Sequence, residues 1–219
     1  MAEPGKAAAP RKLVTRSTAT YVIGRGLIGS FLRTACRLQV RGREHMPRQG
    51  PVLLVANHQS YLDIPALASA VATAAGRHVC FVARDSLARS RFLAFVMRES
   101  GAVLIKRGVP DRAALEETIE HLELGDAVAI FPEGTRSTDG AVGEFRSGAL
   151  LVARRTGCPI VPTGIRGTID VLSRDQKFPR PARVRVSFGA PVDPGSDGAL
   201  ERVRDAVCAL VGDGRAPRD

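Results

Sequence analysis

The residues best suited to chemistry lie in the segment Asn57-His-Gln-Ser-Tyr-Leu-Asp63, which combines an imidazole with a carboxylate. His58 and Asp63 are five positions apart, and on one continuous helix this spacing would turn their side chains away from each other. The chain must therefore bend between them, with Ser60 or Asp63 capping the helix that follows. A carboxylate on one ring nitrogen would leave the other nitrogen as a base for a substrate hydroxyl. A structural loop histidine fits the same spacing, so the alternative stays open.

A second polar segment, Phe131-Pro-Glu-Gly-Thr-Arg-Ser137, has the residue types that hold a phosphate. Gly134 allows close approach of the backbone to a ligand, and Arg136 offers a fork of donors. Glu133 cannot bind phosphate itself, so we expect it to hold Arg136 or another basic group in place. Arg107 ends a third apolar run and is a further basic candidate. A surface turn and a solvated strand end are the alternatives for these two segments.

Both polar segments directly follow apolar runs that suit strands buried on both faces. Ligands gather at the carboxyl ends of strands in open α/β sheets, so the two segments are expected to meet. Strands are predicted at 52–56, 79–83, 102–105, 127–131, 160–165 and 184–188. Helices are predicted at 64–75, 92–98, 111–124, 148–155 and 199–211. This alternation predicts an α/β fold with a mostly parallel central sheet flanked by helices.

The segment 13–40 has a different pattern, because apolar residues recur at helical spacing while four arginines interrupt them. It lacks the roughly 18 consecutive apolar residues of a membrane-spanning helix. It predicts a basic amphipathic helix in the membrane interface, although a helix packed on the domain is also compatible. Gly24-Arg-Gly-Leu-Ile-Gly29 within it formally matches a dinucleotide fingerprint. Only three apolar residues precede it, which is short for a strand, so we expect helix and no dinucleotide site.

Composition limits the classes of partner. The chain has 219 residues, which suits one α/β domain, placed at 41–211, and its net charge of +10 favours an anionic partner. Two tyrosines and no tryptophan provide no base-stacking platform, so nucleic acid is not expected. Four widely separated cysteines predict a reduced, intracellular protein without a metal. Residues 1–12 and 212–219 are predicted to be disordered tails.

In order and spacing, these segments resemble the glycerolipid acyltransferase family, whose best-known members are the 1-acylglycerol-3-phosphate acyltransferases. Asn57 to Asp63 is similar to the HxxxxD block of the family, and Phe131 to Ser137 matches its FPEGTRS block at every position. Arg107 stands where the family places a basic residue after a strand, and Val161-Pro162 falls on a fourth, mostly apolar block. The resemblance covers roughly residues 40–189.

The resemblance implies that His58, oriented by Asp63, activates the sn-2 hydroxyl of lysophosphatidate to attack a thioester of coenzyme A or acyl carrier protein. No bound cofactor and no metal are implied. The implied phosphate-binding residues are Arg107, Glu133, Gly134, Thr135 and Arg136. The enzyme would lie peripherally on the cytoplasmic face of an anionic membrane. Alternatives are another acceptor, such as a lyso-ornithine lipid or glycerol 3-phosphate, and a non-enzymatic module that binds anionic membranes.

Overall fold

A seven-stranded sheet forms the centre of the protein, and the computed structural model describes residues 19–84, 103–105, 112–173, 176 and 178–212. The sheet order is β1-β7-β6-β2-β5-β3-β4. All neighbouring strands are parallel except β6 and β7, which are antiparallel. The strands are β1 Gln39–Arg41, β2 Val52–Ala56, β3 Val79–Arg84, β4 Val103–Ile105, β5 Ala127–Ile130, β6 Ile160–Arg166 and β7 Arg185–Phe188. The mostly parallel sheet predicted from the sequence is therefore confirmed.

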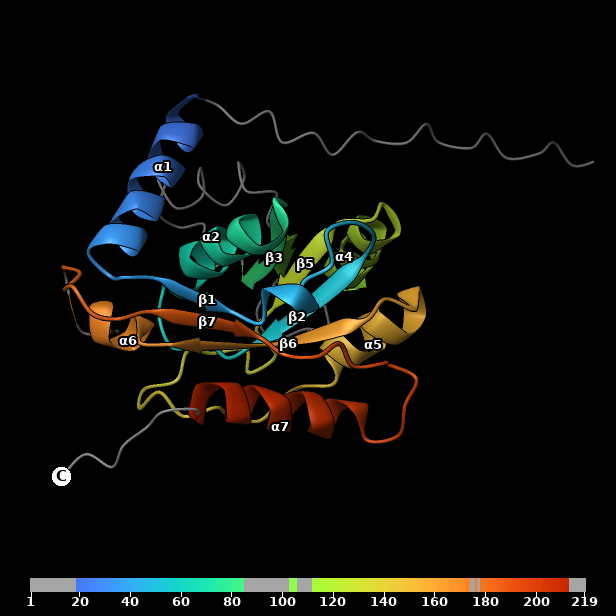
Figure 1. Ribbon diagram of the computed structural model, residues 1–219. Coiled ribbons are helices and arrows are strands. Elements are labelled where there is room, and N and C mark those ends of the chain that lie inside the picture. Colours follow the sequence, from blue (N-terminus) through green and yellow to red (C-terminus); the bar gives the residue numbers. More distant parts are fainter. Residues whose placement is uncertain (1–18, 85–102, 106–111, 174–175, 177, 213–219) are drawn as a thin grey trace, which may run out of the picture.

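Helices cover both faces of this sheet, with α1 and α2 on one side and α7 on the other (Figure 1). Leu54 and Ala56 of β2 belong to the core cluster that includes α2, whereas Leu53 and Val55 belong to the cluster that includes α4 and α5. The uninterrupted apolar run of β2 thus follows from burial on both faces. The helices are α1 Ala19–Thr34, α2 Asp63–Ala75, α4 Arg112–Glu123, α5 Gly148–Thr156, α6 Thr168–Val171 and α7 Ala199–Gly212, with a 3-10 turn at Arg43–His45.

Most predicted elements are present with ends shifted by one or two residues. The predicted helix 92–98, the tail 1–12 and residues 213–219 of the other tail lie outside the described residues. Three elements were not predicted, because each has only three or four residues: β1, α6 and the 3-10 turn at Arg43–His45. The conformation of β1 depends on a partner that is distant in the sequence, because β1 pairs with β7.

The predicted helix over 13–40 is wrong at its carboxyl end. Helix α1 ends at Thr34, Arg37 adopts a positive φ of 47°, and β1 then joins the sheet. Leu32 and Cys36 are fully buried in the core, so this end of the segment packs on the domain. The apolar pattern did not reveal this change because β1 is short and only partly buried.

The glycines of the apparent dinucleotide fingerprint, Gly24 to Gly29, lie inside α1. The segment before them is also helical, so the strand–turn–helix geometry that the fingerprint needs is not formed. In the parts of the chain that the structure describes, no helix combines the length and the apolarity required to cross a bilayer.

Candidate active site

The two polar segments meet at one edge of the sheet, as their positions after strands predicted. β2 and β5 are parallel neighbours, with Val55 opposite Ile130 near their carboxyl ends. His58 follows β2 by two residues, and Glu133 follows β5 by three. Parallel register therefore brings a histidine and the phosphate-type turn together although 75 residues separate them.

His58 and Asp63 form a close pair in this arrangement. Nδ1 of His58 lies 2.7 Å from Oδ2 of Asp63. The Asp63 side chain is fully buried, whereas the His58 side chain keeps 15% of its surface exposed. The pair thus has a buried acid behind a histidine that still reaches the protein surface.

A tight turn makes this contact possible. Oδ2 of Asp63 also accepts hydrogen bonds from the backbone N–H groups of Gln59 at 2.6 Å and Ser60 at 2.8 Å. Asp63 is the first residue of α2, and the Ser60 hydroxyl accepts a hydrogen bond from the N–H of Leu62. The carboxylate therefore folds the chain back onto His58, which overcomes the unfavourable five-residue spacing.

These hydrogen bonds also determine which ring nitrogen of His58 is the base. Oδ2 of Asp63 accepts hydrogen bonds from two backbone N–H groups, so this oxygen acts only as an acceptor. In the contact between Oδ2 and Nδ1 of His58, Nδ1 must therefore be the donor. Nε2 then carries the lone pair. A base of this kind can take a proton from a hydroxyl, and Asp63 stabilises the imidazolium that results.

A distant hydroxyl completes the environment of Asp63. Oγ1 of Thr168, at the start of α6, donates to Oδ1 of Asp63 at 2.5 Å. Both residues are fully buried, and a buried charge is expensive unless it is hydrogen-bonded. Thr168 was not predicted, because it lies 105 residues from Asp63 and belongs to no recognisable motif.

The segment that follows β5 holds His58 by its backbone. Oε1 of Glu133 accepts from the N–H of His58 at 3.0 Å, and the N–H of Ser137 donates to the carbonyl of His58 at 2.8 Å. Burial raises the pKa of the Glu133 carboxyl, while hydrogen bonds from the N–H groups of His58 and Gly143 partly oppose this rise. Glu133 therefore positions the histidine.

This placement narrows the expected role of Glu133. The sequence predicted that Glu133 would hold Arg136 or another basic group in place. No ion pair joins Glu133 to Arg136 among the described residues, and the carboxylate instead accepts from the backbone N–H of His58. The guanidinium of Arg136 instead lies over the Tyr61 ring, with Cζ 3.6 Å from the ring centroid. An aromatic ring orients a guanidinium without neutralising it, so the charge stays available to an anion.

Phe131 packs flat against the imidazole ring of His58. Its ring stacks on the imidazole of His58, with centroids 4.3 Å apart and an angle of 21° between the planes. Phe81 of β3 lies behind Phe131, at a centroid distance of 6.4 Å. Phe131 belongs to the second polar segment, but no role was predicted for it. Sequence spacing does not reveal ring stacking between two segments that follow different strands.

Two amide side chains anchor the first segment to β6. Nδ2 of Asn57 donates to the carbonyl of Ile165 at 2.9 Å, and the N–H of Ile165 donates to Oδ1 of Asn57 at 2.7 Å. Nε2 of Gln59 donates to the same carbonyl at 2.6 Å. These buried contacts continue the sheet pairing beyond the end of β2 and hold the loop that carries His58.

A 480 Å³ cleft opens beside this assembly. Its walls include Glu133, Thr135, Arg136 and Arg146. Gly134 adopts a left-handed φ of 68°, which favours glycine, and its N–H closes a turn onto the carbonyl of Phe131. The structure therefore brings the predicted residues of the second segment together at one surface. Arg107 lies outside the described residues.

Comparison with known proteins adds independent information. Residues 37–166 match the Acyltransferase family profile. The chain is 36% identical over 135 residues to the chloroplastic 1-acyl-sn-glycerol-3-phosphate acyltransferase of Arabidopsis thaliana, a match that covers 60% of this chain and 36% of that protein. It is 32% identical over 161 residues to 1-acyl-sn-glycerol-3-phosphate acyltransferase alpha of Mus musculus, covering 71% of this chain and 55% of the mouse protein.

The fold is also similar to a solved structure, that of the 1-acyl-sn-glycerophosphate acyltransferase of Thermotoga maritima. The TM-score is 0.71 at 30% sequence identity, and the match covers 90% of this chain and 83% of the other. The chain spans little more than a third of the length of the two plant relatives, from Arabidopsis thaliana and Brassica napus.

Proposed function

The chain belongs to the acyltransferase family, and on this premise we propose that it transfers an acyl chain to the sn-2 hydroxyl of 1-acyl-glycerol-3-phosphate, giving phosphatidate. The donor in this proposal is a thioester of coenzyme A or acyl carrier protein. The observation that carries the proposal is the 2.7 Å contact between His58 and Asp63, which leaves Nε2 of His58 as a base at the sheet edge. The relatives named above, which are 1-acyl-sn-glycerol-3-phosphate acyltransferases, support the acceptor.

In the proposed reaction, Nε2 of His58 takes the proton of the acceptor hydroxyl while the oxygen attacks the thioester carbonyl carbon. The tetrahedral intermediate then collapses, the carbon–sulfur bond breaks, and the thiolate takes up the proton from the imidazolium. The new ester and a free thiol leave. Because the acceptor itself is the nucleophile and the thioester is already activated, this sequence needs neither an acyl-enzyme nor a metal ion.

Arg136 is the proposed anchor for the acceptor phosphate. Its guanidinium is held over Tyr61, lines the cleft and belongs to the same segment that binds the His58 backbone. Thr135 lines the same cleft, and Gly134, which precedes it, has no side chain to hinder the approach of a ligand to the backbone. Arg107 is proposed as a second phosphate ligand from the resemblance alone. Holding the phosphate fixes the hydroxyl relative to His58, and positioning of this kind removes several kcal/mol from a barrier.

We also propose that the enzyme acts on the cytoplasmic face of an anionic membrane. Leu27 and Ile28 of α1 are 68% and 37% exposed, and the net charge of +10 favours anionic lipid. The four cysteines are all free, which suits a reducing compartment. In flotation with phosphatidylglycerol vesicles, L27E should weaken binding, and unchanged binding would contradict the role of α1.

A matrix of donors and acceptors tests the proposed reaction. Purified enzyme is incubated with acyl-CoA or acyl carrier protein thioesters and with lysophosphatidate, glycerol 3-phosphate, lysophosphatidylcholine or a lyso-ornithine lipid, and the products are identified by mass spectrometry. We expect phosphatidate from lysophosphatidate. Turnover only with an acceptor that lacks a terminal phosphate would refute the proposed acceptor but not the acyl-transfer chemistry. The absence of turnover in every combination would refute both the acceptor and the chemistry.

A further inference from the structure

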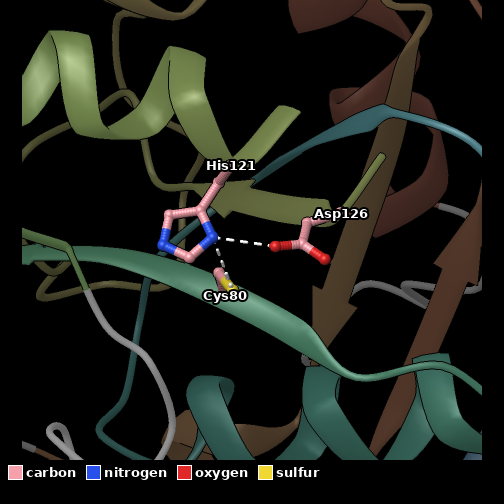
Figure 2. A group of neighbouring side chains, drawn as sticks. All are labelled: Cys80, His121 and Asp126. Atoms are coloured by element: carbon pink, nitrogen blue, oxygen red, sulfur yellow. Dashed lines mark hydrogen bonds and ion pairs between the residues drawn. The ribbon is translucent and has the colours of Figure 1, made fainter. Parts of the chain in front are cut away.

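Three side chains that the reaction does not use converge on one point at the opposite end of β5. Cys80 lies on β3, His121 near the end of α4, and Asp126 directly before β5 (Figure 2). Nδ1 of His121 is 2.8 Å from Oδ2 of Asp126 and 3.5 Å from Sγ of Cys80. Glu133 follows the carboxyl end of β5, and His58 follows the same end of its parallel neighbour β2, so this cluster is separate from the site described above.

The geometry excludes a nucleophilic triad. A triad needs the acid on one nitrogen of the histidine and the nucleophile on the other. Here both contacts fall on Nδ1 (Figure 2). Burial, and then the nearby carboxylates of Asp126 and Glu117, raise the pKa of the Cys80 thiol to about 12, so the free thiol is not an activated nucleophile.

Instead, we propose that Cys80, His121 and Asp126 bind a zinc ion. One sulfur, one imidazole nitrogen and one carboxylate oxygen form a donor set typical of zinc, and the three atoms all lie within 4.8 Å of one another. Tetrahedral zinc, with bonds of about 2.3 Å to sulfur and about 2.0 Å to nitrogen, places these two ligands about 3.5 Å apart. The observed separation of 3.5 Å matches.

For tetrahedral zinc, the nitrogen–oxygen separation of 2.8 Å must widen by about half an ångström, and the sulfur and the carboxylate oxygen, which lie within 4.8 Å of each other, must be about 3.5 Å apart. Asp126 can adjust in this way, because its side chain is 44% exposed and it follows Gly125. That exposure also admits water as a fourth ligand. Nδ1 of His121 exchanges its contacts with Asp126 and Cys80 for a bond to the ion, and its Nε2, buried without a partner among the described residues, loses no contact.

Proton and charge balance follow from this ligand set. Zinc displaces the thiol proton of Cys80, which is released, and the imidazole proton of His121 moves from Nδ1 to Nε2. The thiolate and the Asp126 carboxylate then neutralise the two positive charges of the ion. The bound ion links β3, α4 and the turn before β5, and so fastens α4 to the sheet. This role is independent of acyl transfer.

Cobalt(II) and zinc titrations of the purified full-length protein test the site. We expect one cobalt per chain with a thiolate-to-cobalt charge-transfer band, displacement of cobalt by zinc, and release of about one proton per zinc in calorimetry repeated in buffers of different ionisation enthalpy. We also expect zinc to raise the melting temperature by several degrees. No band, or no proton release, would refute the site.

Substitutions locate the ion. C80S, which is close to isosteric, and D126N should lose the band and the zinc-dependent rise in melting temperature. C208S changes another half-buried cysteine, on α7, and should keep both. H58A should also keep both, which separates this site from the catalytic histidine. A band that survives C80S, or that disappears in C208S or H58A, would overturn the assignment.

Discussion

Replacing Glu133 by alanine should slow catalysis without weakening the binding of the acceptor phosphate. The carboxylate of Glu133 accepts from the N–H of His58 at 3.0 Å, and the substitution removes that acceptor. A hydrogen bond to a charged group contributes about 1.5–3 kcal/mol, which corresponds to about a 10- to 150-fold change in rate. We expect kcat to fall within this range, because the loop that presents His58 loses one of its two backbone attachments.

The assay is steady-state kinetics in which the concentrations of lysophosphatidate and acyl-CoA are varied separately. If Glu133 acts by positioning His58, kcat and kcat/KM fall together and the KM for lysophosphatidate changes little. E133Q keeps an oxygen that can accept from His58, and it should recover activity to within about tenfold of the wild type. A large rise in the KM for lysophosphatidate with kcat unchanged would refute this reasoning and return Glu133 to the phosphate site.

The stability of the same variants gives an independent check. Burial raises the pKa of the Glu133 carboxyl above its ordinary 4.5, so the folded state holds this proton more tightly than the unfolded state does. The free energy of unfolding should therefore fall as the pH rises from 4.5 through the folded pKa, and remain level above it. This part of the pH dependence should disappear in E133Q, as measured by urea unfolding at several pH values. The same slope in both proteins would show that Glu133 does not cause it.

Three further substitutions separate the roles of other residues. T168V removes the donor to Oδ1 of Asp63, so it should lower stability by about 1.5–3 kcal/mol and reduce kcat, with recovery in T168S; full stability and activity in T168V would contradict the contact. R136A should raise the KM for lysophosphatidate about 10- to 100-fold and leave that for acyl-CoA almost unchanged, whereas equal effects on both would argue against phosphate binding. G164A places a Cβ 2.5 Å from a side-chain atom of α7 and should lower stability by about 1–3 kcal/mol in thermal melts. G148A, where no atom lies within 4 Å of the added Cβ, is the matched control and should be neutral.

Strong local patterns in the sequence were sufficient to predict the framework of the site. The apolar run of β2 coincides with the predicted strand at 52–56, and the positions of His58 and Glu133 after parallel strands placed them at one edge of the sheet. These features depend on periodicity and on the general rule that ligands gather at strand ends. The local pattern at 13–40 was less informative, because it did not show that β1 pairs with β7 far along the chain.

What the sequence could not provide were contacts between residues that are far apart in the chain. Thr168 reaches Asp63 across 105 residues, and Phe131 stacks on His58 from the neighbouring strand. Glu133 was expected to hold Arg136 or another basic group, and only the fold shows that its carboxylate accepts from the backbone N–H of His58. The contact between Cys80 and His121 could not be predicted for the same reason. In the sequence Cys80 is an isolated cysteine, whereas the fold brings it to His121 on α4.

The central proposal is that His58 is the base that activates the acceptor hydroxyl. Its most direct test is to measure, for H58A, the rate at which free thiol is released from acyl-CoA in the presence of lysophosphatidate. Circular dichroism and thermal melting establish that the variant is folded, and H45A, which changes a part-exposed histidine in the turn at 43–45, serves as the control. General-base catalysis contributes about 10²–10⁴-fold, so folded H58A should lose at least about 99% of the wild-type rate while H45A retains it. Wild-type turnover by folded H58A would contradict the proposed mechanism.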